Sequence, residues 1–385
     1  MLCNKNECTG CFSCFNACPK GAIEMKEDKC GFIYPVINKE KCINCKLCEK
    51  SCPVLNKVEL KEPKKCYAGR VKNGQELKKA TSGGIATQLS EKFIENNGVV
   101  YGASFEKNCI VSHIRVDNKD ELGKLRGSKY VHSYINNTYK MAKKDLLDGK
   151  KVLFIGTPCQ IAGLRKFLMK EYNNLYTVDL ICHGVPSQKF LQDEVQRINN
   201  NTKIDRVNFR DKKFENFTFS IVKNREDIFS EDWLESPYFY LFMTSIIYRE
   251  NCYNCRYATE KRCSDLTIGD FWGLKEDSKF FSNREKGVSV MLPCTDKGIE
   301  LVKSIQNDIE IEERNVKEAV DGNDQLRSPV VKDKKSDEFR NNYDGNLYKT
   351  YKKVMKKHYY KQKLKSIKTI NRILKIWREI KNEQK

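Results

Sequence analysis

The chain has 385 residues, with 71 Lys and Arg against 51 Asp and Glu, which gives a formal net charge of +20. With 39% hydrophobic and 10% aromatic residues it is too apolar to be disordered throughout, and its length predicts two or three domains with a sizeable core. No stretch approaches the roughly 18–20 apolar residues of a membrane-spanning helix, and the first residues lack the apolar core of a signal peptide. We therefore expect a cytoplasmic protein, where 18 cysteines indicate metal ligands rather than disulfides.

The first 52 residues contain ten of the cysteines, and eight of these form two copies of one pattern. Each copy reads C-x2-C-x2-C-x3-C-P, and the second follows the first by 34 residues. This spacing is typical of two-cluster bacterial ferredoxins, in which the fourth Cys of each run ligates the other cluster. We therefore predict two 4Fe–4S clusters. Their predicted ligands are Cys8, Cys11, Cys14 and Cys52 for one cluster and Cys42, Cys45, Cys48 and Cys18 for the other.

Residues 1–57 are accordingly predicted to form a small ferredoxin-like dicluster domain whose folding depends on its clusters. A pair of zinc sites is the alternative, but zinc sites usually combine C-x2-C units from two separate places in the chain. Cys3 and Cys30 fall outside the pattern and are interpreted as bystanders. The polar segment 55–65 is interpreted as a linker.

Residues 66–331 have the texture of a mixed α/β domain. Short apolar runs alternate with helical stretches, which predicts strands and helices in turn. The predicted strands are residues 98–105, 151–156 and 175–182, and the predicted helices are residues 85–96, 161–170 and 188–199.

A glycine pair opens the first of these helices. Small hydroxyl residues and paired glycines at a helix start, as in Thr81-Ser82-Gly83-Gly84, expose backbone N–H groups to an anion such as a phosphate. An ordinary N-cap and turn is the alternative. The run Arg126-Gly127-Ser128-Lys129-Tyr130 adds two cations and an aromatic ring, and a solvated loop is its alternative.

Two further cysteines follow predicted strands. Cys159 lies in Gly156-Thr157-Pro158-Cys159-Gln160, near a helix N-terminus, where the helix dipole is expected to lower its pKa. Cys182 opens Cys182-His183-Gly184-Val185-Pro186-Ser187 after the next strand. Ligands bind at such carboxyl ends of strands in open α/β sheets.

A later C-x2-C pair, Cys252 and Cys255, is followed by Cys263 and by the segment 265–273 (DLTIGDFWG). Together with Cys159 and Cys182, these residues provide four or five ligands for a third metal centre. A zinc site that uses His183 is the competing interpretation. The histidines show no H-E-x-x-H or triad-like grouping, so no catalytic residue is predicted.

In combination, these motifs resemble the beta subunit of coenzyme F420-reducing hydrogenases and dehydrogenases. The resemblance rests on the dicluster run with SGG, RGSKY, GTPCQ, CHGVPS, C-x2-C and GDFWG, and it extends from about Cys8 to about Val331. It implies an α+β protein in which the ferredoxin-like domain precedes a mixed α/β flavin-binding domain. It also implies an oxidoreductase that passes electrons between 4Fe–4S clusters and FAD.

The resemblance further implies hydride transfer to or from a small organic acceptor, such as coenzyme F420 or a substrate in polysaccharide metabolism. By motif, Ser82, Gly83 and Gly84 would approach the flavin phosphates, with Ser128, Lys129, Tyr130 and Asp270 near the flavin. Cys159, Cys182, Cys252 and Cys255 would hold a third 4Fe–4S cluster, with Cys263 as a substitute ligand. A non-catalytic electron-transfer or docking subunit of a larger redox complex is the alternative. Either function implies a redox partner protein or small electron carrier.

The charge is concentrated at the C-terminus. Residues 349–385 hold 14 Lys and Arg against two Glu, which accounts for +12 of the formal +20. This weakens a nucleic-acid interpretation, and no nucleic-acid partner is predicted. Within a predicted helical tail at 345–385, Ile367, Ile370, Leu374 and Trp377 recur at helical spacing. Such a basic amphipathic helix is typical of contact with a membrane surface, here the inner face, or with a partner; packing on its own domain is the alternative.

Overall fold

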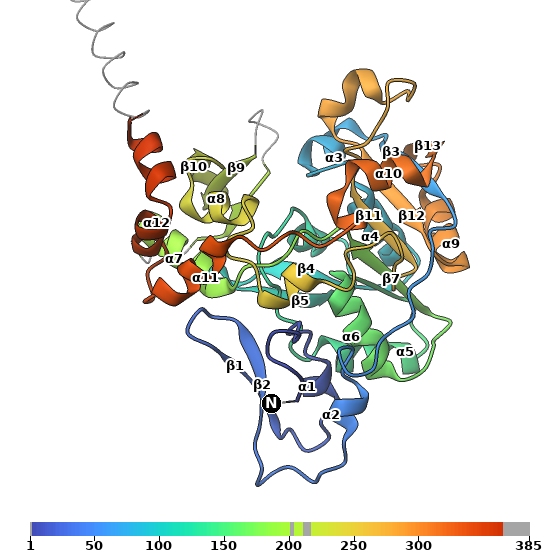
Figure 1. Cartoon of the computed structure of the whole chain (residues 1–385). Coiled ribbons are helices and arrows are strands. Elements are labelled where there is room, and N and C mark those ends of the chain that lie inside the picture. Colours follow the sequence, from blue (N-terminus) through green and yellow to red (C-terminus); the bar gives the residue numbers. More distant parts are fainter. Residues whose placement is uncertain (1, 201–203, 211–216, 365–385) are drawn as a thin grey trace, which may run out of the picture.

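The computed structural model describes residues 2–200, 204–210 and 217–364. Figure 1 shows a small cysteine-rich N-terminal domain at the bottom, a large sheet with helices above it, and a lobe of helices and a small sheet beside that sheet. The architecture is therefore α+β, with a ferredoxin-like domain followed by a mixed α/β domain, as the sequence predicts.

The two cysteine repeats fold into equivalent turns. Gly10 and Phe12 in the first repeat have φ of 65° and 61°, and Asn44 and Lys46, 34 residues later, have φ of 53° and 56°. A short helix follows each turn, and an antiparallel hairpin lies between the two repeats. In chain order the elements are α1 (Ser13–Ala17), β1 (Ile23–Glu27), β2 (Ile33–Ile37) and α2 (Leu47–Lys50).

The large sheet has eight strands in the order β13-β3-β12-β11-β7-β6-β4-β5. Its centre, β11-β7-β6-β4, is parallel, and antiparallel strands extend it on both sides. The strands are β3 (Cys66–Val71), β4 (Val99–Phe105), β5 (Val111–Val116), β6 (Val152–Gly156), β7 (Leu175–Leu180), β11 (Leu266–Asp270), β12 (Ser289–Pro293) and β13 (Ile309–Arg314).

Alternating side chains of these strands build two apolar layers, one on each face of the sheet. Tyr101 and Phe154 pack with α5 and α6 on one face, whereas Val100 and Leu153 pack with α4 and α9 on the other. The helices are α4 (Ile85–Glu95), α5 (Thr138–Leu147), α6 (Pro158–Leu168) and α9 (Asp296–Ile305). Both faces of the central strands are therefore covered, as parallel strands require.

The adjacent lobe has an aromatic core, in which Phe190, Phe219, Tyr238 and Phe239 are buried. The sequence did not predict this lobe as a separate part. Its elements are α7 (Gln188–Asn199), β8 (Arg206–Asn208), β9 (Thr218–Lys223), β10 (Glu226–Asp232), α8 (Pro237–Met243), α11 (Lys334–Asn342) and α12 (Leu347–Val354). The three strands form an antiparallel sheet in the order β10-β9-β8.

Shorter elements connect these parts. They are α3 (Gly74–Lys79), α10 (Val316–Gly322), and the 3-10 helices η1 (Lys107–Cys109), η2 (Leu122–Leu125), η3 (Glu250–Asn254), η4 (Phe281–Lys286) and η5 (Asp324–Leu326). Within the described ranges, no helix has both the length and the apolar character to cross a membrane.

The ferredoxin-like domain packs directly on both parts of the larger domain. Phe12 belongs to the same apolar layer as α5 and α6, and its ring lies 5.9 Å from that of Tyr134. The Asn16 side-chain amide donates to the carbonyl oxygen of Asn136 at 2.7 Å. On the other side, the Phe32 ring lies 5.8 Å from the Phe190 ring in the lobe. The domain is therefore fixed in position by buried contacts.

The predicted strands and helices match the observed ones closely. The strand expected at 175–182 ends at Leu180, so Cys182 lies in the loop after β7. Helix α6 begins at Pro158, three residues earlier than predicted, because Thr157 and Gln160 form a capping box around its first turn. The helix expected at 188–199 coincides with α7.

Two other segments pack more closely than the sequence suggested. In the expected linker, Val58 is buried. Lys61 forms an antiparallel β-bridge with Arg262, in which the backbone N–H of each residue donates to the carbonyl oxygen of the other. In the tail, Tyr351 and Val354 of α12 are buried in the aromatic lobe. The apolar residues predicted to line the tail helix, Ile367, Ile370, Leu374 and Trp377, lie outside the described residues.

Candidate iron–sulfur and cofactor sites

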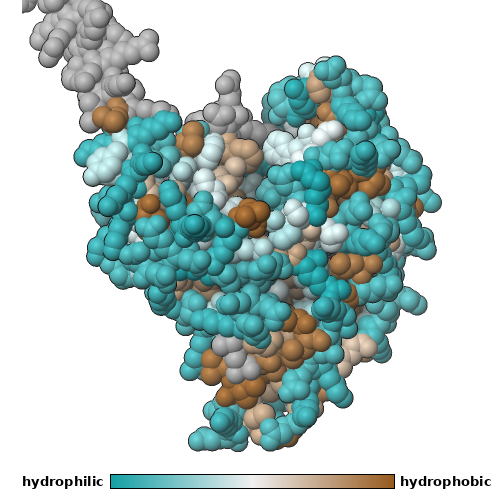
Figure 2. All heavy atoms as spheres, viewed as in Figure 1, coloured by the Kyte–Doolittle hydropathy of each residue, from teal (hydrophilic) through white to brown (hydrophobic). Residues whose placement is uncertain are grey.

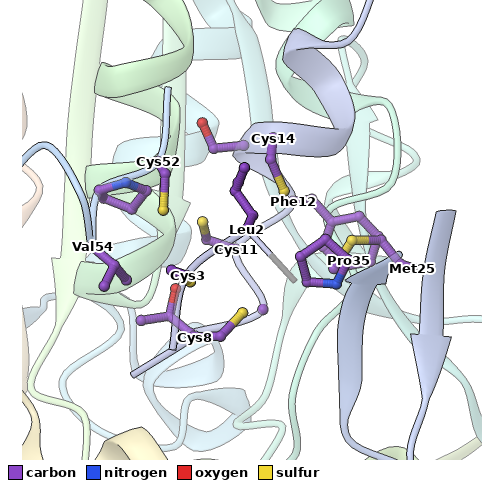
Figure 3. A pocket seen from close by; sticks show the side chains of 14 residues that line it. Leu2, Cys3, Cys8, Cys11, Phe12, Cys14, Met25, Pro35, Cys52 and Val54 are labelled. Carbon is purple, nitrogen blue, oxygen red and sulfur yellow. The ribbon is translucent and has the colours of Figure 1, made fainter. Parts of the chain in front are cut away.

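The first cysteine set surrounds a shared cavity inside the N-terminal domain. Cys8, Cys11 and Cys14 reach it from the first turn and α1, and Cys52 reaches it from the end of α2. Figure 3 shows their sulfur atoms turned toward this space. All four are buried, and this set is called the inner site below. The pairing of the fourth Cys of the second repeat with the first three of the first repeat is the one that the spacing predicts.

Backbone amides point at the sulfur atoms of the inner site. The N–H groups of Gly10, Ser13 and Phe15 hydrogen-bond to Cys8, Cys11 and Cys14, respectively, and each of these bonds lowers the pKa of its thiol. Burial acts in the opposite direction and raises the pKa of Cys11 to about 12. Such thiols become thiolates when a metal binds them, and the amide donors then stabilise the negative charge. The donor set therefore fits an iron–sulfur cluster.

Cys3 also lines the inner site, although the sequence pattern leaves it out. Its thiol hydrogen-bonds to the sulfur atoms of Cys8 and Cys52, and this lowers the pKa of Cys8 to about 6 and that of Cys52 to about 7. Cys3 is therefore a fifth thiol at a four-ligand site. The other presumed bystander, Cys30, is buried in the aromatic lobe near the carbonyl oxygen of Arg340.

The second set, called the outer site, lies nearer to solvent. Cys45 is exposed, and Cys18, Cys42 and Cys48 are half-buried. The Ala22 N–H donates to the Cys18 sulfur at 3.2 Å. Partial burial raises the pKa of the Cys48 thiol, and the negative charge of Cys18 raises it further. The two sulfur atoms therefore lie close enough for their charges to interact.

Throughout the described part of the chain, no three or more His, Cys, Asp or Glu side chains are arranged around a point that would hold a metal ion. The cysteines of the inner site instead border a space between them (Figure 3), as the separate corners of an iron–sulfur cube require.

A third set lies at the carboxyl edge of the parallel strands. Cys159 lies in the first turn of α6 after β6, Cys182 follows β7, and Cys252 and Cys255 lie in and just after η3. Burial raises the pKa of all four thiols, and that of Cys159 and Cys182 to about 12. The charges of neighbouring thiols of the set, Cys255 among them, add to this effect at Cys159, Cys182 and Cys252. The fold therefore brings together the four residues that the family resemblance implies as ligands; this group is called the third site.

The third site also has amide donors. The N–H groups of Gly184 and Val185 hydrogen-bond to Cys182 and Cys252, respectively. The expectation that the helix dipole lowers the pKa of Cys159 is wrong, because burial outweighs the dipole and raises this pKa to about 12. Metal binding, rather than the helix end, must supply the driving force for its ionisation.

The other two candidate ligands make other contacts, although the Cys263 thiol lies close enough to Cys159 for the two charges to interact. The Cys263 thiol donates to the carbonyl oxygen of Pro158 at 3.3 Å and is buried in the layer between α6 and the sheet. His183 lines the neighbouring cavity, where burial lowers its pKa and Asp270 and Asp324 partly offset that effect.

The inner and third sites lie on opposite ends of the same helical face. Gly163 of α6 packs against Cys11: a Cβ atom at this glycine would lie 3.1 Å from the Cys11 sulfur. Cys159 lies four residues earlier, on the same side of the helix. One turn of α6 therefore separates the residue that contacts the inner site from a residue of the third site.

A large cavity of about 310 Å³ opens beside the third site, at the carboxyl ends of β4, β6, β7 and β11. Thr157 lines it, and the Thr157 hydroxyl lies 3.2 Å from the Cys159 sulfur, so a single side chain separates the cavity from the third site. Six of the seven residues predicted to bind the flavin line this cavity: Ser82, Gly84, Ser128, Lys129, Tyr130 and Asp270.

Gly83, the seventh, packs against the sheet instead. Its N–H donates to the Ser289 hydroxyl at 2.9 Å, and a side chain at this position would collide with the carbonyl oxygen of Gly69. Gly84 then takes a positive φ of 83° and starts α4, which has no side-chain cap. The N–H groups at the start of this 11-residue helix are therefore available to an anion in the cavity.

Positive charge gathers around the same cavity. The Lys129 ammonium donates to the carbonyl oxygens of Leu125 and Arg126 at 2.9 and 2.8 Å, and burial lowers its pKa to about 7. Arg210, which the sequence did not single out, pairs with Asp270 at 2.5 Å. The exposed ring of Trp272 lines the cavity as well.

Two parts of the chain match known families. Residues 149–319 match the family described as the C terminus of the coenzyme F420 hydrogenase/dehydrogenase beta subunit, and residues 7–56 match the 4Fe–4S dicluster domain. A coenzyme F420-dependent sulfite reductase of Methanocaldococcus jannaschii is 27% identical over 184 residues, which are 46% of this chain. The chain spans only 28% of the length of that relative.

Two more proteins are similar to this chain. An uncharacterised ferredoxin of Methanocaldococcus jannaschii is 36% identical over 67 residues, which are 17% of this chain and 84% of that protein. A chain of the F420-reducing NiFe hydrogenase complex from Methanosarcina barkeri is 20% identical, with a TM-score of 0.48 over 69% of this chain and 91% of that chain.

Proposed function

Because residues 149–319 of this chain belong to the coenzyme F420 hydrogenase/dehydrogenase beta subunit family and residues 7–56 to the 4Fe–4S dicluster family, we propose that it is an iron–sulfur flavoprotein oxidoreductase. The outer, inner and third sites would each hold a 4Fe–4S cluster, and the large cavity would hold FAD. When bound, these groups would move single electrons between clusters and flavin and exchange two electrons and a proton, as a hydride, with a small organic acceptor.

The observation that carries this proposal is the unbroken order of the cysteine sites. Cys11 of the inner site packs on α6 at Gly163, Cys159 of the third site lies one turn away, and Thr157 beside Cys159 already lines the cavity. Electrons can therefore pass from the exposed outer site toward the cavity through neighbouring sites.

The residues of the cavity suit a flavin dinucleotide. The uncapped start of α4 offers N–H groups to the phosphates, and Ser128, which hydrogen-bonds to Thr81 at 3.3 Å, holds the RGSKY segment against this turn. Lys129 can hold a proton and a positive charge beside a reduced, anionic ring. Asp270 keeps the Arg210 guanidinium in place at the opposite wall.

The outer site suits an electron-carrying partner protein. Figure 2 shows apolar surface on the lower part of the molecule, over the N-terminal domain. Two apolar side chains of this domain are exposed: Leu55, and Ile43, which follows the half-buried Cys42 in the chain. All 18 cysteines are free, which fits the reducing cytoplasm. Contact of the basic tail with the inner face of a membrane remains part of this proposal.

Anaerobic purification followed by assay of iron, labile sulfide and released flavin tests the proposal. We expect about twelve irons and one flavin per chain, since each cluster holds four irons. Protein without flavin would contradict the assignment of the cavity. If the loaded protein were reduced by a ferredoxin-type carrier but transferred no electrons to a deazaflavin or another two-electron acceptor, the electron-transfer subunit would replace the enzyme as the better description.

A further inference from the structure

Arg249 is a buried cation without a carboxylate partner. It immediately precedes η3, only 1% of its surface is exposed, and none of the described carboxylates lies within ion-pair distance of it. Buried arginines are normally paired, because an isolated charge loses its hydration on burial. The charge of Arg249 therefore needs another explanation.

The guanidinium of Arg249 is held against the inner site. Its Nε donates to the carbonyl oxygen of Cys8 at 2.7 Å, and its Nη2 donates to that of Ile33 at 2.8 Å. The Tyr34 ring lies under the cation at 4.4 Å. These contacts fix the cation in position, but they supply no negative charge.

The third nitrogen is directed at the turn that carries the cysteines. Nη1 of Arg249 is buried and has no hydrogen-bond partner, and a Cβ atom at Gly10 would lie 3.1 Å from it. Gly10 lies between Cys8 and Cys11 in the chain, and its N–H donates to the Cys8 sulfur. The guanidinium also hydrogen-bonds to the Cys8 sulfur, so it faces the loop that wraps the inner site.

Other buried arginines of this protein are neutralised. Arg262, 2% exposed, pairs with Asp179 at 3.1 Å and donates to the Thr267 hydroxyl. The half-buried Arg340, which also lies over the Phe32 ring, pairs with Glu250 at 2.6 Å. The lack of a carboxylate beside Arg249 is thus specific to the position next to the cysteines.

The charge of Arg249 acts on thiols of two sites. The charge lowers the pKa of the Cys8 thiol, and only the hydrogen bond from Cys3 lowers it more. At Cys159 the charge also lowers the thiol pKa, but the effect of burial is larger and raises it. A 4Fe–4S cluster with four thiolates is anionic and gains one more negative charge on reduction, so a fixed cation nearby stabilises the reduced state more than the oxidised one.

We propose that Arg249 is a positioning residue for electron transfer: its buried charge is the counter-ion of the inner cluster and raises the reduction potential of that cluster above that of the outer one. The electron added to the cluster comes from a one-electron donor at the outer site, and no bond forms or breaks. The inference rests on the proposed placement of the clusters. At the exposed outer site water stabilises the added negative charge, whereas the inner site is buried, so the charge of Arg249 must outweigh the cost of burial to make the inner cluster the preferred position for an electron.

The test is an anaerobic redox titration of the full chain, monitored by electron paramagnetic resonance. Two variants identify the inner cluster: Cys45→Ser removes a ligand of the outer site, and Cys255→Ser removes one of the third site. The reduction step that remains in the titrations of both variants belongs to the inner cluster. In Arg249→Met and Arg249→Gln we expect the equilibrium constant for reducing this cluster to fall at least tenfold, which is about 59 mV for one electron. Arg249→Lys keeps the charge and should lie close to the unmodified protein.

Arg340→Met is the matched control, since it also removes a cation beside Phe32, but one that is already paired. A shift in Arg249→Met no larger than in this control would overturn the inference, and so would an equal shift in Arg249→Lys. If the neutral variants do not accumulate, His132→Glu is the second test. His132 lies beside Gly10 together with the Arg249 guanidinium, so the new carboxylate would face this cation. The reduction potential of the inner cluster must then fall. Unmodified protein that lacks the ferredoxin irons would refute the cluster assignment instead.

Discussion

Cys11 lies directly against Gly163, where a Cβ atom would meet the Cys11 side chain at 3.0 Å. This contact joins the N-terminal domain to α6, the helix whose first turn carries Cys159. Helix α1, which follows Cys11 in the chain, packs on both α5 and α6. This contact between the two cysteine-bearing parts of the chain therefore depends on a residue without a side chain.

Enlarging Gly163 should weaken this contact. In Gly163→Ala the new Cβ atom would lie 3.0 Å from the Cys11 Cβ and 3.0 Å from the Tyr139 hydroxyl, so both neighbours must move, at a cost of about 1–3 kcal/mol. We expect a lower thermal midpoint and a slower passage of electrons from the ferredoxin clusters to the cavity, measured by stopped-flow spectroscopy. Gly74→Ala, where a Cβ atom meets open space, is the control and should behave like the unmodified protein.

Removing a third-site ligand should remove one cluster and leave two. Cys255 lies with Cys159, Cys182 and Cys252, so Cys255→Ser should lower the iron content from about twelve to about eight per chain. Cys263 bonds to the carbonyl oxygen of Pro158, and Cys263→Ser should therefore retain all the iron. The reverse result, with iron lost only in the Cys263 variant, would show that Cys263 is the ligand.

Cys3 offers a sharper test of the inner site, because five thiols surround it. Cys3→Ala should keep the full iron content, since Cys8, Cys11, Cys14 and Cys52 provide the ligands that the spacing requires. The hydrogen bonds of Cys3 to Cys8 and Cys52 would be lost, which should slow cluster assembly in the iron-free protein. Loss of about four irons in Cys3→Ala would instead identify Cys3 as a ligand.

The sequence allowed much of this organisation to be predicted where local spacing determines geometry. The repeated C-x2-C-x2-C run predicts two equivalent turns, and the matched positive φ of Gly10 and Asn44 shows them. The apolar runs predicted as strands became β4, β6 and β7, because parallel strands buried on both faces need continuous apolar residues.

Long-range features escaped prediction for a physical reason. Strand β3 pairs with β13, so Cys66 lies opposite Arg314, and no local pattern connects residues so far apart in the chain. Spacing alone does not distinguish Cys255 from Cys263, because the fold brings both thiols close enough to Cys159 for their charges to interact. Arg249 carries no motif, and its role emerges only from burial and from the missing carboxylate.

Binding of an anionic flavin should be coupled to proton uptake at Lys129. Burial lowers the pKa of Lys129 from 10.5 to about 7, so at pH 8 most of the ligand-free protein carries a neutral amine there. A phosphate or a reduced flavin in the cavity favours the charged form and raises this pKa again. Calorimetry at pH 8 in buffers of different ionisation enthalpy should show protons taken up on binding, and Lys129→Met should abolish the uptake.

The same shift predicts how the stability of the flavin-free protein depends on pH. Between pH 7 and 10.5 the unfolded chain binds a proton at Lys129 that the folded protein does not, so this residue lowers the free energy of unfolding progressively as the pH falls through that range. Below pH 7 the penalty is constant. Lys129→Met should therefore raise the thermal midpoint more at pH 7 than at pH 10, and an equal change at both values would show that the lysine is charged in the fold.

The buried pair of Asp179 and Arg262 should support the edge of the sheet that carries the third site. Asp179 of β7 is fully buried, accepts from Arg262 at 3.1 Å and from the Thr267 hydroxyl of β11 at 2.6 Å. Asp179→Ala leaves the Arg262 charge buried without a partner, which costs about 3–5 kcal/mol. We expect a large fall in the thermal midpoint, together with loss of iron from the third site, because Cys263 and the strands beside Cys182 shift with Arg262.

Asp277→Ala is the matched control for this pair. Asp277 also accepts from a buried arginine, Arg314 at 2.7 Å, but 71% of the Asp277 side chain is exposed, and Glu318 still neutralises the guanidinium at 3.0 Å. Water and the remaining carboxylate should limit the fall in the thermal midpoint to a small part of that in Asp179→Ala. Equal losses in the two variants would mean that Arg262 finds solvent or another partner when Asp179 is removed, and that β7 and β11 are held together by backbone pairing alone.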